Sequence, residues 1–195
     1  MKSLCFLMIA IFGSGYFLFA QDRSYEERVS SFQDSINRFQ KDPKTTQLIE
    51  DEYEHFDHLE FFPVNESFRV EARFVEEHDP HQFKLTYSDD LDVPLYVTSG
   101  ILFFSIEGQN YSLHVYQNVK WLSDPKMSDH LLVPFKDWTN GPVSYGGGRF
   151  LDLKKPQDGE TVILDFNFSY NPPCAYNYYM ACPLIPECNH IEREI

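Results

Sequence analysis

The hydrophobic positions of the chain change their spacing near residue 67, from a helical period to a strand period. Before that point, apolar side chains recur every three or four residues, as on one face of an amphipathic helix: Val29, Phe32, Ile36 and Phe39. Ser24 and Glu27 stand at the spacing of a capping box, so the pattern predicts a helix over residues 25–40. A second, shorter helix is predicted over residues 46–56.

Beyond residue 67, apolar and polar side chains alternate, which is typical of half-buried strands. The pattern predicts strands at 68–75, 83–88, 95–107, 111–117, 131–135, 149–154 and 161–170. Gly108 to Asn110 has the composition of a hairpin turn. We therefore predict a mainly β, α+β fold: an antiparallel barrel- or sandwich-like sheet with two N-terminal helices packed on one side or capping an end.

Residues 1–20 have the organisation of a cleavable signal peptide. Lys2 gives a positive start, an apolar run follows, and Ala20 precedes a polar segment. An uncleaved membrane anchor is the alternative, since about 20 apolar residues span a bilayer, but Gly13 and Gly15 interrupt the run. We expect cleavage after Ala20, a single mature domain over 21–195, no membrane association afterwards, and a periplasmic or extracellular location.

The acidic net charge of the chain argues against anionic partners. The whole chain carries a formal charge of −14, and loss of Lys2 with the leader leaves 15 basic and 30 acidic side chains. Nucleic acids and anionic lipid surfaces are recognised by clustered Lys and Arg, which this chain lacks. We therefore expect no nucleic-acid partner, and we interpret the acidity first as a solubility feature.

Three cysteines remain after cleavage. In an oxidising compartment Cys174 and Cys182 are the natural disulfide pair, because they close a short loop and leave Cys188 single. Pairing of Cys182 with Cys188 is the alternative.

Several segments have a distinctive composition: Phe61-Phe62-Pro63-Val64, Phe135-Lys136-Asp137-Trp138-Thr139-Asn140-Gly141, Ser144-Tyr145-Gly146-Gly147-Gly148-Arg149-Phe150-Leu151-Asp152-Leu153 and Leu164-Asp165-Phe166-Asn167-Phe168-Ser169-Tyr170-Asn171-Pro172-Pro173-Cys174-Ala175-Tyr176, closed by Cys182-Pro183-Leu184. Together they resemble a bacterial and archaeal family catalogued as domain of unknown function 1684. The resemblance covers nearly the whole mature chain and implies kinship with a family that has no established reaction. The chain departs from it at Cys188, where relatives usually carry Glu, and at Ile195, where relatives are expected to continue into a short Ala-Gly-Glu tail.

The segment from Tyr145 to Arg149 is a candidate ligand-binding loop. Its three glycines permit close approach of a ligand or of another backbone, and no Lys-Ser/Thr follows them as in a phosphate loop. Arg149 is the best candidate for gripping an anion, because its planar guanidinium can hold a carboxylate at two points. The alternative is a structural ion pair with Asp137, Asp152 or Asp165.

The last predicted strand places its polar side chains on one face, which would line a cavity if the sheet closed. The alternative is that this face simply meets water. On the first interpretation, the domain binds a small polar or anionic ligand in a cleft formed by Tyr145, Arg149, Asp165, Asn167, Tyr170 and Asn171.

Two other function classes remain open. The domain could be a hydrolase or isomerase, with Asp137 or Asp165 as general base and Arg149 as an anion clamp, or it could be purely structural. No cofactor or metal site is predicted, because His55/His58 and His78/His81 lie at a helix end and a turn, and Asp89, Asp90 and Asp92 lack the rest of a calcium loop.

Overall fold

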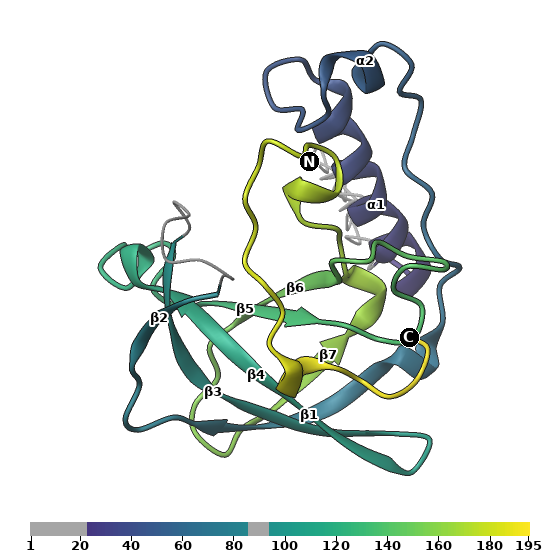
Figure 1. Cartoon of the computed structure of the whole chain (residues 1–195). Helices are drawn as coiled ribbons and strands as arrows, with labels where there is room; N and C mark the ends of the chain where they lie inside the picture. The colour runs from purple at the N-terminus through teal and green to yellow at the C-terminus, as the bar shows by residue number, and fades with distance from the viewer. Residues whose placement is uncertain (1–22, 86–93) are drawn as a thin grey trace, which may run out of the picture.

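The computed structural model describes residues 23–85 and 94–195. The predicted signal peptide and the acidic residues Asp89, Asp90 and Asp92 lie outside these residues. The strands are β1 (Arg69–Glu76), β2 (Gln82–Lys84), β3 (Leu95–Ile106), β4 (Gln109–Asn118), β5 (His130–Phe135), β6 (Arg149–Lys154) and β7 (Thr161–Asp165). They form one antiparallel sheet in the order β6-β5-β4-β3-β1-β7, with β2 paired to β3 (Figure 1).

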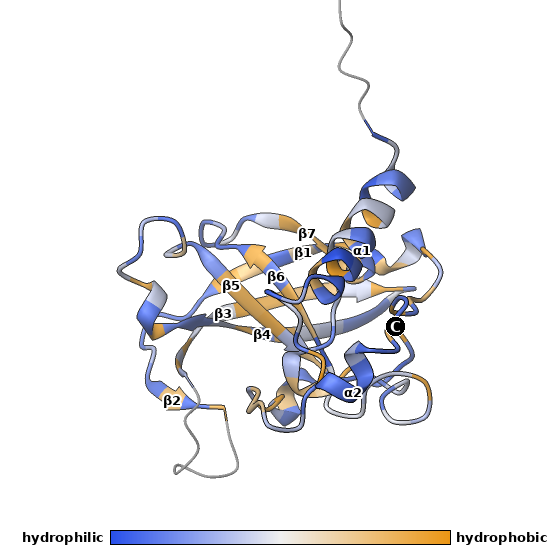
Figure 2. Cartoon of the chain, turned by 90° about the horizontal axis from the view of Figure 1, so that it is seen from above, coloured by the Kyte–Doolittle hydropathy of each residue, from blue (hydrophilic) through white to orange (hydrophobic). Residues whose placement is uncertain are grey.

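The sheet curls into a half-barrel, which confirms the predicted mainly β fold class. Its concave side holds the main core, because every second side chain of the alternating strands points inward. Figure 2, which colours the ribbon by hydropathy, shows that apolar residues concentrate along the strands. Fully buried members of this core are Phe74, Leu102, Leu113, Val133 and Leu164.

The predicted hairpin between β3 and β4 is formed, but its turn lies at Glu107 and Gly108, because Gln109 and Asn110 already pair as part of β4. Glu107 and Gly108 both have positive φ, 51° and 81°, as a two-residue turn of type I′ requires. Closer to its start, β3 shifts register between Thr98 and Gly100. At Gly100 the backbone runs so close to β1 that an added Cβ would overlap the carbonyl oxygen of Val75 and the ring of Phe74.

Helix α1 (Tyr25–Lys41) begins with the predicted capping box, in which Ser24 and Glu27 bond reciprocally. It stands over one end of the half-barrel (Figure 1), with Val29 fully buried. Helix α2 (Glu50–Tyr53) is much shorter than the predicted 46–56. The reason is local: the buried Gln40 side chain accepts a hydrogen bond from the backbone N–H of Gln47 and holds that segment out of the helix.

The prediction of a strand over 161–170 is wrong beyond Asp165. There the Asp165 side chain accepts a hydrogen bond from the Asn167 backbone N–H and starts a 3-10 helix, η3 (Phe166–Phe168). A capping side chain competes with the sheet ladder for the backbone donor. Other 3-10 turns are η1 (Glu66–Phe68), η2 (Val119–Trp121), η4 (Pro173–Ala175) and η5 (Glu187–Asn189).

The last nine residues, 187–195, which we call the tail, cross the sheet where β4 and β5 share a single paired position, Tyr116 with Leu132. The buried Asn189 side chain accepts from the His114 N–H and donates to the His114 and Pro134 carbonyl oxygens. One side chain therefore supplies hydrogen bonds that a strand neighbour would otherwise make.

Cys174 and Cys182 form a disulfide, as predicted, and Cys188 is free. Among the described helices, none combines the length and the apolar character that crossing a membrane requires.

Replacing Gly100 by Ala is expected to lower the free energy of unfolding by about 1–3 kcal/mol, because the new methyl overlaps β1. Urea unfolding followed by circular dichroism measures the change. Gly146→Ala is the matched control, since its added methyl meets no atom closer than 3.8 Å. Equal stability of the two variants would show that the close approach at Gly100 is not real.

Candidate functional site

A cavity of about 1170 Å³ lies between α1 and the half-barrel. One side is closed by residues 59–65, which we call the strap, running in extended form from α2 to β1 (Figure 1). The loop after β5, the segment after η3 and the end of the tail complete the wall. Apolar and polar side chains both line it, which is typical of small-molecule sites.

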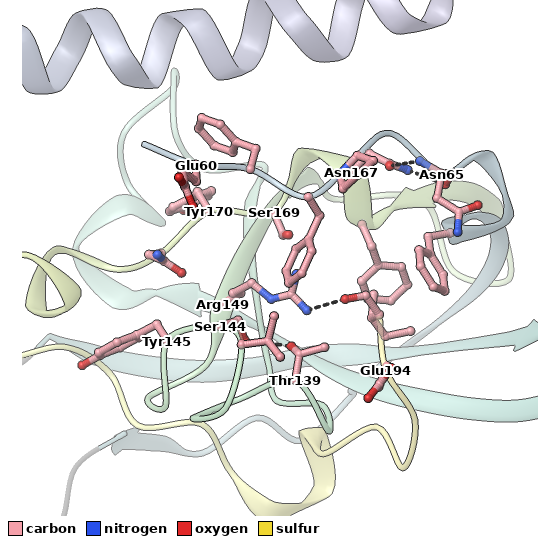
Figure 3. A pocket seen from close by; sticks show the side chains of 18 of the residues that line it. Glu60, Asn65, Thr139, Ser144, Tyr145, Arg149, Asn167, Ser169, Tyr170 and Glu194 are labelled. Atoms are coloured by element: carbon pink, nitrogen blue, oxygen red, sulfur yellow. Dashed lines mark hydrogen bonds between the residues drawn. The ribbon is translucent and has the colours of Figure 1, made fainter. Parts of the chain in front are cut away.

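Arg149, the first residue of β6, lines this cavity (Figure 3). It is 6% exposed, and its Nη2 donates to Asp137 Oδ2 at 3.0 Å and to the Ile195 main-chain oxygen at 2.9 Å. Its guanidinium carbon lies 5.3 Å from the Phe62 ring centre and 4.9 Å from that of Phe135. Two aromatic faces therefore fix the plane of the guanidinium.

Arg149 keeps unused hydrogen-bonding capacity. Its Nε is buried and has no partner, and both of its hydrogen bonds leave from Nη2. Burial lowers the pKa of Arg149, and the Asp137 carboxylate opposes that shift. A guanidinium has five N–H donors, and only those of Nη2 have partners among the described residues, so this side chain keeps unused donors at the cavity wall.

Asp137, proposed above as a general base, is fully engaged. Its side chain has no exposed surface. Oδ1 accepts from the Thr139 hydroxyl at 2.8 Å, and Oδ2 accepts from Arg149 and from the Ile195 N–H at 2.7 Å. The ion pair that was the alternative role for Arg149 is thus formed with Asp137.

The glycines before Arg149 serve the backbone and leave little room for a ligand. At Gly148 φ is +95°, and an added Cβ would overlap Ile185 and the Phe135 carbonyl oxygen. At Gly147 an added Cβ would meet the ring of Tyr145. The loop is therefore a close-packed turn that orients Tyr145 and Arg149 toward the cavity.

The structure brings five of the six predicted ligand-binding residues to the cavity wall: Tyr145, Arg149, Asn167, Tyr170 and Asn171. Asp165 is not among the lining residues. It accepts from the Tyr25 hydroxyl at 3.0 and 3.1 Å and lies 3.7 Å from Arg69 Nε. The Asp165 carboxylate also accepts from the Asn167 side-chain amide at 2.9 Å, so it anchors α1 and holds Asn167, which does line the cavity.

Several lining side chains are held in place by hydrogen bonds to other parts of the chain. Asn167 accepts from the Asn65 N–H at 2.8 Å and donates to the Asn65 carbonyl oxygen at 2.9 Å, which fixes one end of the strap. The Tyr145 hydroxyl donates to Cys174 Sγ at 3.6 Å. Burial, with Asp152 nearby, raises the pKa of Tyr170. The hydrogen bonds hold Asn167 and Tyr145 in one orientation.

The sequence prediction missed a large part of the wall. Gln33 and Ile36 of α1, Trp138 and Val143 of the loop after β5, and Arg193 of the tail all line the cavity. Two segments of distinctive composition, Phe61 to Val64 in the strap and Phe135 to Gly141 with Trp138, were noted in the sequence without indicating a site. Among the described residues, no three His, Cys, Asp or Glu side chains are grouped so that they could hold a metal ion.

Comparison with known proteins places the chain in a family. The family model described as "Protein of unknown function (DUF1684)" matches residues 54–195. An uncharacterised protein of Haloarcula marismortui, known from a solution NMR structure, is 33% identical, with a TM-score of 0.70 over 88% of this chain and 91% of that one. No curated protein matches. The chain therefore belongs to the DUF1684 family of proteins of unknown function.

Proposed function

We propose that this protein is a binding domain that holds a small ligand in the cavity between α1 and the half-barrel. The observation that supports it best is Arg149, a buried guanidinium inside a cavity, with an unpartnered Nε and two aromatic faces around it. Buried polar groups are normally satisfied. Nε of Arg149 and Nε of Arg193, which lines the same cavity, have no hydrogen-bond partner among the described residues, and this supports an oxygen acceptor bound beside them.

The chemistry of the wall describes the ligand. Phe62, Phe166 and Trp138 offer aromatic surface, so the ligand has an apolar or aromatic body. Arg149 calls for a carbonyl or hydroxyl oxygen. A full negative charge is less well matched, because Asp137 already neutralises the guanidinium at 3.0 Å. Of the two ligand classes expected from the sequence, the polar one is therefore the one we propose.

The geometry gives less support to the enzyme hypothesis. A general base needs a lone pair directed at the substrate, whereas Asp137 and Asp165 use both of their oxygens on protein donors. A purely structural role would leave the cavity and the unpaired Nε without explanation. Binding is the function that uses both features.

We further propose that the domain works outside the cytosol, after removal of residues 1–20. The disulfide between Cys174 and Cys182 is compatible with an exported protein. It closes the loop that carries Tyr176 to the cavity wall, so oxidation and site formation are linked.

The uncharged fluorescent probe N-phenyl-naphthylamine tests the cavity. We expect saturable binding to the wild-type domain and a loss of affinity of about tenfold or more in Ser169→Trp, because an indole at that lining position fills the space. Ser112→Trp is the matched control, since Ser112 is exposed on the outside of β4. Equal binding by both variants would place the probe elsewhere and overturn the proposal.

The free energy of unfolding tests the buried ion pair between Asp137 and Arg149. Asp137→Asn is expected to lower the free energy of unfolding by about 3–5 kcal/mol, because Arg149 is left as a buried charge without its anionic partner. Asp129→Asn breaks an exposed pair with Lys154 and should leave the urea unfolding curve nearly unchanged. Overlapping curves for the two variants would contradict a buried, coupled pair.

Export is tested by mass. The chain produced in a bacterial host with its own leader should be recovered from the periplasmic or extracellular fraction, beginning at Gln21. Its intact mass should lack two hydrogens relative to the fully reduced polypeptide, because Cys174 and Cys182 are joined. Recovery of the full 195-residue chain from the cytosol, with three free thiols in the mature region, would refute this location.

A further inference from the structure

The positive charges that line the cavity are paired with carboxylates, whereas the negative charges that line it are not. Two arginines line it, and each is paired: Arg149 with Asp137 and Arg193 with Glu107, both at 3.0 Å. Two glutamates line it as well, Glu60 from the strap and Glu194 from the tail. Neither carboxylate makes a hydrogen bond or ion pair with the described part of the chain. The described lining contains no Lys, His or Asp.

The two unpaired carboxylates stand at separate places on the rim. Figure 3 shows Glu60 on the strap side and Glu194 on the tail side, with Arg149 between them. Both are exposed, so a ligand can reach them without opening the core. Because the arginines are neutralised, the net charge that a ligand meets at the mouth is negative.

Aromatic surface reinforces this preference. Trp138 is 65% exposed and Phe62 44% exposed, and both line the cavity. The faces of such rings attract cations, Trp most strongly. The protein as a whole is also strongly acidic, so its long-range field draws cations toward it and repels anions.

We infer that the ligand of this cavity carries a positively charged amine or quaternary ammonium group, which the negative charge of Glu60 and Glu194 and the ring of Trp138 attract to the mouth while the apolar body and an oxygen acceptor reach toward Arg149. This inference rests on the proposed binding function and names the chemical class of its ligand. The alternative is that the acidic residues serve solubility alone. In that case the carboxylates of Glu60 and Glu194 would not affect ligand binding.

Three probes of nearly equal size separate these possibilities: phenethylamine, phenethyl alcohol and phenylacetate, measured by ligand-observed NMR titration at low ionic strength. We expect the amine to bind about tenfold more tightly than the alcohol, and phenylacetate to bind most weakly. In the double variant Glu60→Gln/Glu194→Gln the amine should fall to the affinity of the alcohol, whose own binding stays unchanged.

The matched control is Glu54→Gln/Glu192→Gln, which removes two exposed charges from neighbouring segments outside the cavity. It should keep the amine preference. Phenylacetate binding as tightly as the amine, or equal loss of the preference in both double variants, overturns the inference while the binding proposal stands, provided Ser169→Trp still blocks all three probes. If no probe binds, or if Ser169→Trp blocks none, the binding proposal fails and the inference falls with it.

Discussion

The buried junction of Asp137, Arg149 and the main chain of Ile195 is the contact on which the site depends. It joins the loop after β5, the first residue of β6 and the end of the tail, which are far apart in the sequence. An arginine this deeply buried is costly without a partner. Asp137 supplies the charge and Ile195 the remaining acceptor, so the tail becomes part of the cavity floor.

A second anchor gives the tail its path. Asn189 bonds to His114 and Pro134 at the place where β4 and β5 have almost no ladder of their own. The half-barrel is therefore completed by one amide side chain, where a full strand would otherwise be needed. Since the sheet does not close, its open end must be covered, and α1 with the strap provides the cover. The cavity is the space that remains between the cover and the sheet.

Local pattern was sufficient for most of the fold. The period-two alternation located β6 at residues 149–154 and the hairpin of β3 and β4, and the capping box located the start of α1. The pattern failed where a side chain overrides periodicity. Asp165 ends β7 by capping η3, and Gln40 holds Gln47 out of the second predicted helix.

The site was predictable only in part, for a related reason. Arg149 could be singled out from its own chemistry, and Asp137 was one of three partners considered. The Ile195 oxygen, the strap and α1 reach the cavity through contacts across the whole chain, and no spacing in the sequence encodes them. Asp165 was assigned to the cavity on the expectation that one strand continues to residue 170. The strand ends at Asp165 and η3 follows, so the side chains beyond it do not continue the alternation of a strand.

The way the polar groups are held favours binding over catalysis. Asn167 and Tyr145 line the cavity and are hydrogen-bonded to other parts of the chain, and the buried Asp137 uses both of its oxygens on protein donors, so these groups are held in place. Fixed groups lower the ordering cost of holding a ligand, whereas a proton-transfer site needs a group free to gain and lose a proton. Nε of Arg149 is held in place by two rings and lacks an acceptor among the described residues, as does Nε of Arg193. Rigid donors of this kind discriminate by position, which supports the binding function proposed above.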